Sequence, residues 1–270
     1  MKLMVLGRYG PFPAPGGACS SYLIEGPKLP GKTGPDDEKV RIVIDLGAGA
    51  LSRLLSVCPI KNIDAVILSH LHSDHMSDML VLRYALQQYR ARGVNVPMPL
   101  HVIAPSEPEA EFRLLSSSGT FNMVRAEDKL KVKFGALSIT LHRMYHPVPS
   151  YAVDILEEEE TRPRTYGPKQ PQKRFFYTGD TGLHDGIVPA CADATLLLAD
   201  TGMLAREKTA EFAPHLTAKE AGEIARDAGV GALLCTHVWG GGVADEQILD
   251  EARLAFANTE VAQEMRLYEI

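Results

Sequence analysis

The stretch LSHLHSDHMSDM at residues 68–79 restricts the fold of this chain more than any other feature. Three histidines and an aspartate fall within six positions, shortly after the apolar run AVIL. His70 and His72 are two positions apart on an extended segment, so their side chains leave the same face and can hold one metal ion. Asp74 and His75 follow at a turn and can face a second ion. A helix cap needs one such residue rather than four, so the stretch predicts a metal site at a strand end.

Other candidate ligands lie at the ends of later strands. His146 follows the alternating run ITLHRM and precedes a proline, whereas His142 shares its face but lies inside the strand. Asp180 occupies the glycine-flanked turn TGDTG, where a carboxylate can bridge two ions, and His237 ends the run ALLCT. Each residue alone is more often part of a turn or a satisfied polar group, and the joint spacing is what indicates a site. Imidazole with carboxylate suits zinc, with manganese or ferrous iron as substitutes, and a catalytic site leaves one position open for water.

Composition and charge describe an ordinary globular chain. Of its 270 residues, 45% are apolar and 23% are charged, which predicts a soluble protein with one domain or two closely fused halves. The formal charge of −6 weighs against the broad basic surface that non-specific nucleic-acid binding requires. The opening MKLMVLG is too short for the apolar core of a signal peptide, and no run of about 18 apolar residues occurs, so we expect a cytoplasmic protein without a membrane segment.

The four cysteines lie far apart in the sequence and form no CxxC pair. A disulfide framework or a thiolate zinc site is therefore not expected in a reducing cytosol. We interpret them as small buried apolar residues: Cys19, Cys58, Cys191 and Cys235.

Short aliphatic or β-branched runs recur along the chain and predict strands that mix with helices. The predicted strands cover residues 2–7, 20–25, 40–47, 63–69, 99–104, 136–144, 174–180, 194–200 and 232–237. Runs such as VRIVID and ATLLLAD are apolar on both faces, so their sheets should be covered on both sides. Two apolar patterns with helical spacing precede a glycine that can end a helix: Met79, Leu82, Leu86 and Tyr89 before Gly93, and Ala221, Ile224, Ala225 and Ala228 before Gly229. A layered α/β architecture follows.

Two segments rich in glycine, proline and charge are predicted to be loops. Residues 26–39 and 157–174 should be solvated, the second as the tip of a long hairpin. The run WGGG at 239–242 is typical of a turn but would also suit the mouth of a substrate site. A nucleic-acid clamp is an alternative for the hairpin tip, although the four preceding glutamates would cancel much of its field. The basic residues of the tip are Arg162, Arg164, Lys169, Lys173 and Arg174.

Taken together, SHLHSDH, His146, TGDTG and His237 resemble the five metal motifs of the metallo-β-lactamase superfamily. The resemblance covers nearly the whole chain, from MVLGRYGPFPAPGGACSSYLIE to the terminal strand. It implies a single domain over residues 1–270 with an α/β fold, the four-layer αββα metallo-β-lactamase sandwich. In that fold two mixed β-sheets pack face to face, helices lie outside, and metals bind at one edge.

The same resemblance implies a dinuclear centre of two divalent metal ions, with zinc expected and manganese or iron as alternatives. One ion would be bound by His70, His72 and His146, and the other by Asp74, His75 and His237, with Asp180 between them. The remaining candidates match no motif and are expected to be structural: His101, His142 and His184.

The segment FAPHLTAKEAGEIA at 212–225 narrows the chemistry. Thr217 and Glu220 form a T-x-x-E capping box, which predicts a helix start at 217 whose positive end favours an anion. His215 lies two residues earlier, where it could hold a phosphate oxygen or protonate a leaving alkoxide. The alternative is an incidental surface histidine beside an ordinary helix cap.

The HLT of this segment also resembles the His-x-Thr motif of the ribonuclease Z-like branch, which includes tRNA 3′-processing nucleases and small phosphodiesterases. In that branch an acidic residue at an earlier strand end pairs with the histidine, and LLLADTG places Asp200 there, with aspartate in place of glutamate. The long arm by which ribonuclease Z grips tRNA would lie between Tyr151 and Lys173, where this chain has too few residues for it. The sequence therefore favours a small-substrate phosphodiesterase.

The expected enzyme is a dinuclear metal-dependent hydrolase whose metal-bridging hydroxide attacks a small or nucleotide-type phosphodiester in line. Asp74 would orient that water or accept its proton, and Asp180 would hold the ions together. His215, steadied by Asp200, would protonate the departing oxygen. Contact with RNA is less favoured, and a homodimer is compatible with the sequence without being specified by it.

Three alternatives stay open at this point. A tRNA 3′-processing nuclease would use the same centre. A hydrolase of lactones, thioesters or β-lactams would use it too, because activated water attacks a carbonyl equally well. The third is a non-catalytic metal-binding protein, although a purely structural zinc site closes its coordination with four protein ligands and this chain offers seven.

Overall fold

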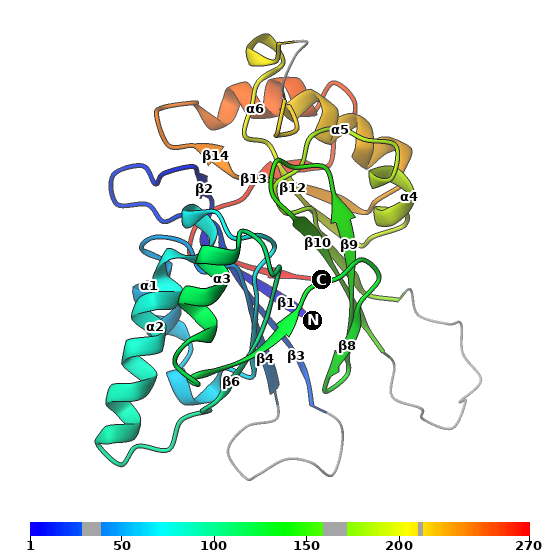
Figure 1. Ribbon diagram of the computed structural model, residues 1–270. Coiled ribbons are helices and arrows are strands. Elements are labelled where there is room, and N and C mark those ends of the chain that lie inside the picture. The colour runs from blue at the N-terminus through cyan, green and yellow to red at the C-terminus, as the bar shows by residue number, and fades with distance from the viewer. Residues whose placement is uncertain (29–38, 159–171, 210–212) are drawn as a thin grey trace, which may run out of the picture.

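Two seven-stranded β-sheets face each other in the centre of the structure, and helices cover their outer faces (Figure 1). The computed structural model describes residues 1–28, 39–158, 172–209 and 213–270. In spatial order, the first sheet consists of β16 (Leu267–Glu269), β1 (Lys2–Gly7), β3 (Ser21–Pro27), β4 (Lys39–Ile44), β5 (Ala65–Ile67), β6 (Leu100–Ala104) and β7 (Phe121–Arg125). The second consists of β15 (Thr259–Val261), β13 (Ala232–Thr236), β12 (Leu196–Asp200), β11 (Arg174–Tyr177), β10 (Ser150–Glu157), β9 (Leu137–Met144) and β8 (Lys131–Phe134).

The two sheets share one internal arrangement. In the first, β1, β3 and β4 are antiparallel neighbours, whereas β4, β5, β6 and β7 run parallel. In the second, β8 to β11 are antiparallel, whereas β11, β12, β13 and β15 run parallel. Parallel strands bring their carboxyl ends to one edge of a sheet, so each sheet gathers the residues that follow those strands. A short parallel ladder also joins β2 (Tyr9–Gly10) to β14 (Val238–Trp239).

Alternating side chains on the central strands reach different cores. In β4, Ile42 and Ile44 enter the apolar core between the sheets, whereas Val43 enters the core under the helices of the first sheet. In β12, Leu198 points into the central core and Leu197 into the core under the helices of the second sheet. The prediction that these sheets are covered on both faces is therefore confirmed.

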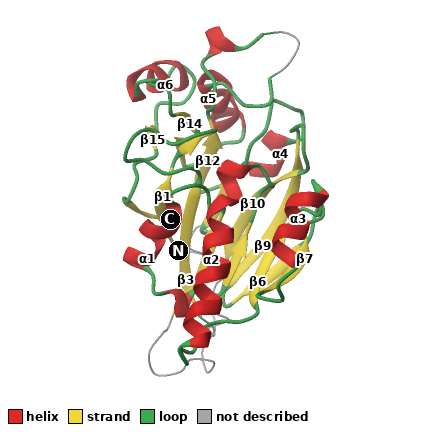
Figure 2. Cartoon of the chain, turned by 60° about the vertical axis from the view of Figure 1, so that its left-hand side comes forward, coloured by secondary structure: helices red, strands yellow, loops and turns green. Residues whose placement is uncertain are grey.

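Six α-helices of the described residues supply the two outer layers (Figure 2). The first sheet is covered by α1 (Ala50–Val57), α2 (Ser73–Ala91) and α3 (Glu109–Ser116), and the second by α4 (Ile187–Cys191), α5 (Ala218–Asp227) and α6 (Asp245–Ala252). Short 3-10 turns occupy Ile60–Asn62 and Ala205–Glu207. The layers follow the order helix, sheet, sheet, helix, so the predicted four-layer αββα sandwich is confirmed.

All nine predicted strands are present, with ends shifted by a few residues. The prediction omits β2, β7, β8, β10, β14, β15 and β16. Most of these are short or lie at sheet edges, where exposed polar side chains weaken the apolar signal. In β10, Asp154 interrupts an otherwise apolar run. The strand tolerates this charge because the guanidinium of Arg174 on β11 donates to both carboxylate oxygens of Asp154, at 2.8 and 2.9 Å.

The predicted apolar face of α2 is correct except at its last position. Met79, Leu82 and Leu86 are fully buried, but the side chain of Tyr89 is 41% exposed. Tyr89 lies near the end of a long helix that extends past the sheet it covers (Figure 2). The prediction for α5 is confirmed, since its apolar residues Ala221 and Ile224 are buried.

The predicted hairpin is confirmed in the strands that flank its tip. β10 and β11 pair antiparallel, from Val153 opposite Tyr177 to Leu156 opposite Arg174. Most of both predicted loops lies outside the described residues, including three of the basic positions: Arg162, Arg164 and Lys169. Arg174 is not a free cation for a nucleic-acid clamp, because its guanidinium is engaged by Asp154.

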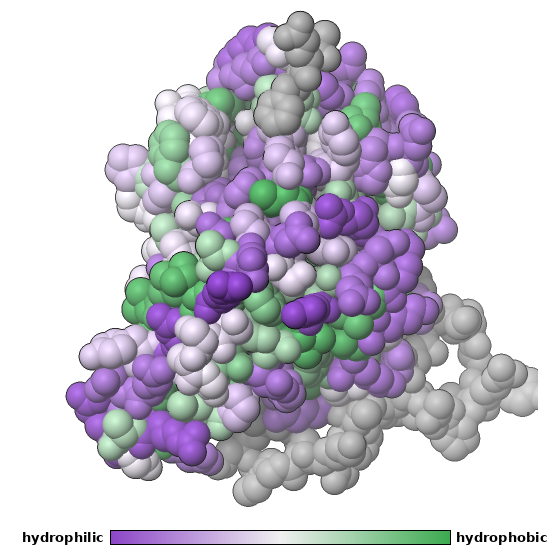
Figure 3. Space-filling view, in the orientation of Figure 1, coloured by the Kyte–Doolittle hydropathy of each residue, from purple (hydrophilic) through white to green (hydrophobic). Residues whose placement is uncertain are grey.

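Fourteen large apolar side chains of the described residues are exposed at the surface. The face in Figure 3 shows apolar residues as several separate patches among polar ones. The four cysteines are all buried and form no disulfide bond, as predicted. Within the described ranges, no helix has both the length and the apolar character that crossing a bilayer requires.

The capping box of α5 generates a prediction about stability. Thr217 Oγ1 accepts a hydrogen bond from the Glu220 N–H (3.1 Å), and the Glu220 carboxylate accepts one from the Thr217 N–H (2.9 Å). Thr217→Ala should lower the free energy of unfolding by about 1 kcal/mol, because it leaves an N–H of the first turn without its acceptor. Urea titrations at equal metal content should show this loss, with Thr217→Ser close to the wild type. Equal midpoints for all three proteins would contradict it.

Candidate metal centre

The predicted ligands lie together at the edge where the carboxyl ends of the parallel strands meet. His70 and His72 occupy the link between β5 and α2, and Asp74 and His75 form the first turn of α2. The second sheet contributes residues that lie one to three positions after the ends of β9, β11 and β13: His146, Asp180 and His237. The start of α2, which packs on the first sheet, thus faces three strand ends of the second sheet.

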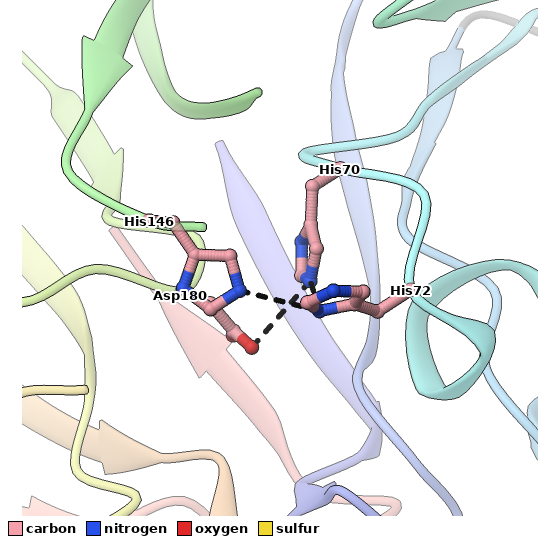
Figure 4. A group of neighbouring side chains, drawn as sticks. All are labelled: His70, His72, His146 and Asp180. Atoms are coloured by element: carbon pink, nitrogen blue, oxygen red, sulfur yellow. Dashed lines mark hydrogen bonds and ion pairs between the residues drawn. The ribbon is translucent and has the colours of Figure 1, made fainter. Parts of the chain in front are cut away.

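One group of donor atoms consists of His70, His72, His146 and Asp180 (Figure 4). The Nδ1 atom of His72 lies 3.1 Å from Nε2 of His70 and 3.2 Å from Nε2 of His146. The carboxylate Oδ2 of Asp180 lies 3.6 Å from Nε2 of His70. In Figure 4 these side chains come from two sides and point toward one another.

A second group consists of Asp74, His75, Asp180 and His237. Nε2 of His237 lies 3.2 Å from Oδ2 of Asp74 and 3.1 Å from Oδ2 of Asp180. Nε2 of His75 lies 3.3 Å from Oδ1 of Asp180. Asp180 therefore belongs to both groups and can reach an ion in each.

Both groups fit divalent metal ions. Donors around a tetrahedral ion with bonds of about 2.1 Å stand about 3.4 Å apart, and the separations above run from 3.1 to 3.6 Å. Nε2 of His75 and Oδ1 of Asp180 are also fully buried without a hydrogen-bond partner. Buried polar atoms are rarely left unpaired, so a cation between them satisfies both.

The residue that holds His75 in place was not predicted from the sequence. Asp45 follows β4 with a backbone φ of 54° and is fully buried. Its carboxylate accepts hydrogen bonds from Nδ1 of His75 (2.8 Å), the hydroxyl of Tyr177 (2.9 Å), and the amide (2.7 Å) and hydroxyl (2.8 Å) of Ser69. The sequence signal that could have identified Asp45 is VIDLG, in which an aspartate ends an apolar strand two residues before a glycine. Such partners fix the orientation of a metal-binding imidazole.

The two groups differ in charge. Burial lowers the pKa values of His70, His72 and His146 in the first group. Burial opposes protonation of His237 too, but the nearby carboxylates of Asp180 and Asp74 outweigh it and raise its pKa to about 10. The second group, which holds two carboxylates, therefore stabilises positive charge strongly.

His215 and Asp200 form a third cluster next to the second group. Nδ1 of His215 lies 2.9 Å from Oδ2 of Asp200, so aspartate reaches the histidine although it is one methylene shorter than glutamate. The ring of His215 stacks on that of His237 with centroids 4.8 Å apart. Burial lowers the pKa of His215, but the adjacent Asp200 carboxylate reverses this and raises it. The side chain remains 21% exposed, which leaves it accessible from the solvent side.

Three other histidines lie outside these groups. His142 accepts a hydrogen bond from Lys129 (2.8 Å) and lies 3.3 Å from Asp154. His101 contacts Asn122, and His184 accepts from the amide of Gly186. The structure thus brings together all nine predicted site residues and separates these three from them.

The domain model of the β-lactamase superfamily matches residues 40–238. The chain belongs to the metallo-β-lactamase superfamily. One relative, the "Probable metallo-hydrolase YhfI" of Bacillus subtilis, is 30% identical over 258 residues, which cover 95% of this chain and 94% of the relative. The crystal structure of YhfI superposes with a TM-score of 0.83 and 28% identity, and covers 100% of this chain and 99% of that one. The protein is therefore a metallo-hydrolase of this superfamily, a class that uses divalent metal ions.

More distant members carry other names. The ribonuclease Z of Archaeoglobus fulgidus is 24% identical over 274 residues, which cover 85% of this chain and 88% of the relative. The short form of human tRNase Z superposes with a TM-score of 0.65 at 15% identity, and covers 100% of this chain and 99% of that one. At that identity the superposition establishes the shared fold alone.

The contrast between His146 and His142 yields a prediction about metal binding. His146→Ala removes a donor from the first group, and should weaken metal affinity by more than the roughly 10- to 100-fold that the loss of an outer hydrogen-bond partner costs. His142→Ala should leave metal content and turnover nearly unchanged, because the polar partners of His142 are Lys129 and Asp154, and neither belongs to a donor group. Elemental analysis after dialysis, with turnover measured on the same samples, would test both. Equal effects of the two substitutions would contradict the placement.

Proposed function

We propose that this metallo-hydrolase is a dinuclear phosphodiesterase that acts on a small or nucleotide-type phosphodiester. The observation that supports this most is the His215–Asp200 pair (2.9 Å) beside the second donor group. Hydrolysis of a phosphodiester with an alkoxide leaving group needs a proton donor at the departing oxygen. A histidine oriented by a carboxylate next to the metal centre can supply it.

The donor set supports two zinc ions, with manganese or iron as alternatives. His70, His72 and His146 would hold one ion, and Asp74, His75 and His237 the other, with Asp180 shared. When bound, the two ions would activate a water molecule and polarise the phosphoryl group.

The chain's own residues have distinct tasks in this proposal. Asp74 orients the attacking water through the carboxylate oxygen that lies 3.2 Å from His237. Asp45 keeps the second donor group in register through His75. Asp200 accepts a hydrogen bond from Nδ1 of His215, which directs the opposite ring nitrogen, Nε2, toward the leaving group.

A small substrate fits the chain better than tRNA does. The segment between β10 and β11 spans residues 158–173, which is short for an arm that grips tRNA, and the net charge is −6. The relatives named ribonuclease Z keep RNA cleavage as the second candidate. None of the four cysteines forms a disulfide bond, which supports the cytoplasm as the compartment.

A panel of three substrates separates the candidate reactions. Purified protein would be assayed on bis(p-nitrophenyl) phosphate, on nitrocefin and on a lactone. Hydrolysis of the diester alone supports the proposal, and preferential turnover of nitrocefin or the lactone would replace it with carbonyl hydrolysis. A pre-tRNA substrate added to the panel would identify RNA processing.

The two donor groups predict the metal stoichiometry. Protein purified without chelator should contain about two equivalents of transition metal per chain. Chelation should abolish turnover, and zinc or manganese should restore it. A content of one equivalent or fewer after metal is supplied in excess would contradict the dinuclear centre.

His215→Ala should slow turnover by roughly 10²- to 10⁴-fold while both metal ions stay bound. The loss should be smaller for a diester that releases nitrophenolate, because that anion leaves without a proton, and larger for one that releases a poorly acidic alcohol. Rates on both diesters, with metal content measured on the same protein, would show the difference. An equal loss on both, or loss of metal, would instead make His215 a substrate anchor or a ligand.

A further inference from the structure

An exposed aromatic pair stands beside the metal centre and has no part in the chemistry described so far. The rings of Phe12 and Trp239 meet edge to face, with centroids 5.0 Å apart and planes at 72°. Their side chains are 43% and 42% exposed. We call this pair, Phe12 with Trp239, the aromatic wall.

The backbone connects the aromatic wall to the second donor group on both sides. Trp239 lies two residues after His237. Phe12 lies two residues after Gly10, and a Cβ atom built on Gly10 would stand 2.0 Å from Nε2 of His237. That nitrogen is the one that faces Asp74 and Asp180. The chain around Gly10 therefore lines the ion-facing side of the imidazole, and Phe12 can be at most about 7 Å further along it.

Close packing holds the aromatic wall in place. β2 and β14 pair in parallel, with Gly10 opposite Trp239. A Cβ atom on Gly240 would stand 2.3 Å from the carbonyl oxygen of Phe12, and one on Gly241 would stand 2.1 Å from Nε1 of Trp239. A larger residue at Gly240 would displace the backbone of Phe12, and one at Gly241 would displace the indole ring of Trp239. These glycines therefore position the aromatic pair, in addition to making a turn.

We propose that the aromatic wall binds a planar ring of the substrate by stacking, and so selects phosphodiesters that carry a nucleobase. Its role in substrate choice rests on the phosphodiesterase function proposed above. Both rings belong to residues two positions from Gly10 or His237, that is within about 7 Å of chain, so a base linked through a sugar to a phosphate in the metal centre would come close to them. Aromatic side chains stack on every base, because each base has a π-face, and this contact does not depend on base identity.

Exposed aromatic side chains also include Tyr145, which directly precedes the donor His146, and Tyr84, which lies elsewhere. Tyr84 is 63% exposed, but it lies in the middle of α2 on the outside of the first sheet. It offers a matched control, because its truncation removes an exposed aromatic ring far from the strand ends that carry the donors.

The only tryptophan of the chain is Trp239, so its fluorescence reports on the aromatic wall directly. Metal-loaded protein would be titrated with thymidine 5′-monophosphate and, separately, with ribose 5-phosphate, which carries the phosphate and sugar but no base. We expect saturable quenching by the nucleotide and none by ribose 5-phosphate. Phe12→Ala should weaken nucleotide binding roughly 5- to 100-fold, and Tyr84→Ala should leave it unchanged.

A kinetic arm uses two diesters with the same nitrophenolate leaving group, thymidine 5′-(p-nitrophenyl) phosphate and methyl p-nitrophenyl phosphate. In Phe12→Ala and Trp239→Ala, the preference for the thymidine ester should fall by a similar factor, mainly through KM. If these variants hydrolyse both diesters with an unchanged preference, the proposed role of the aromatic wall is wrong and the proposed phosphodiesterase function stands. Failure to hydrolyse either diester, while thymidine 5′-monophosphate still quenches Trp239, would overturn the phosphodiesterase and retain a nucleotide-binding wall. Equal quenching by ribose 5-phosphate would overturn base stacking.

Discussion

The structure depends on the burial of one carboxylate, that of Asp180. Its side chain is 2% exposed, yet it stands between two groups of metal-competent donors. An ionised carboxylate withdrawn from water costs several kcal/mol unless opposite charges or hydrogen-bond donors surround it. His70, His75 and His237 approach it at 3.6, 3.3 and 3.1 Å, and one of its oxygens still lacks a hydrogen-bond partner. Divalent ions in this position would satisfy both the carboxylate and the imidazoles.

Hydrogen bonds between the two sheets hold the donors at these distances. Tyr177, at the end of β11, donates to Asp45, at the end of β4 (2.9 Å). The hydroxyls of Tyr22 on β3 and Thr236 on β13 lie 2.7 Å apart, and the rings of Tyr22 and Tyr177 are in contact. These residues are buried just below the metal centre, so the sheet separation and the positions of His75 and His237 are set together. A change in this interface would move donors of one sheet relative to those of the other.

Around the metal centre, one set of residues positions the reacting groups and a different set is proposed to select the substrate. Asp45 and Asp200 act on imidazoles through short hydrogen bonds, from strand ends that are fully buried. Phe12 lies on a loop and Trp239 ends the two-residue strand β14, and both expose their rings, as specificity elements at the rim of a rigid scaffold commonly do. Residues of this kind can differ between relatives that share the fold and the donor set.

The sequence by itself determined the strands that carry the site and the residue types that bind a metal. HxHxDH after a buried strand, and single residues such as Asp180 at glycine-flanked turns, are local patterns, and each could be read without knowing its neighbours in space. Short edge strands such as β16 were not predictable in this way, because their few residues have little periodicity. Only the tertiary structure decided that Asp45 holds His75 and that Phe12 meets Trp239, and it brought the predicted partner Asp200 within reach of His215. Each of these contacts joins residues far apart in the chain, and its distance is set by how the two sheets and their loops pack, which no local pattern encodes.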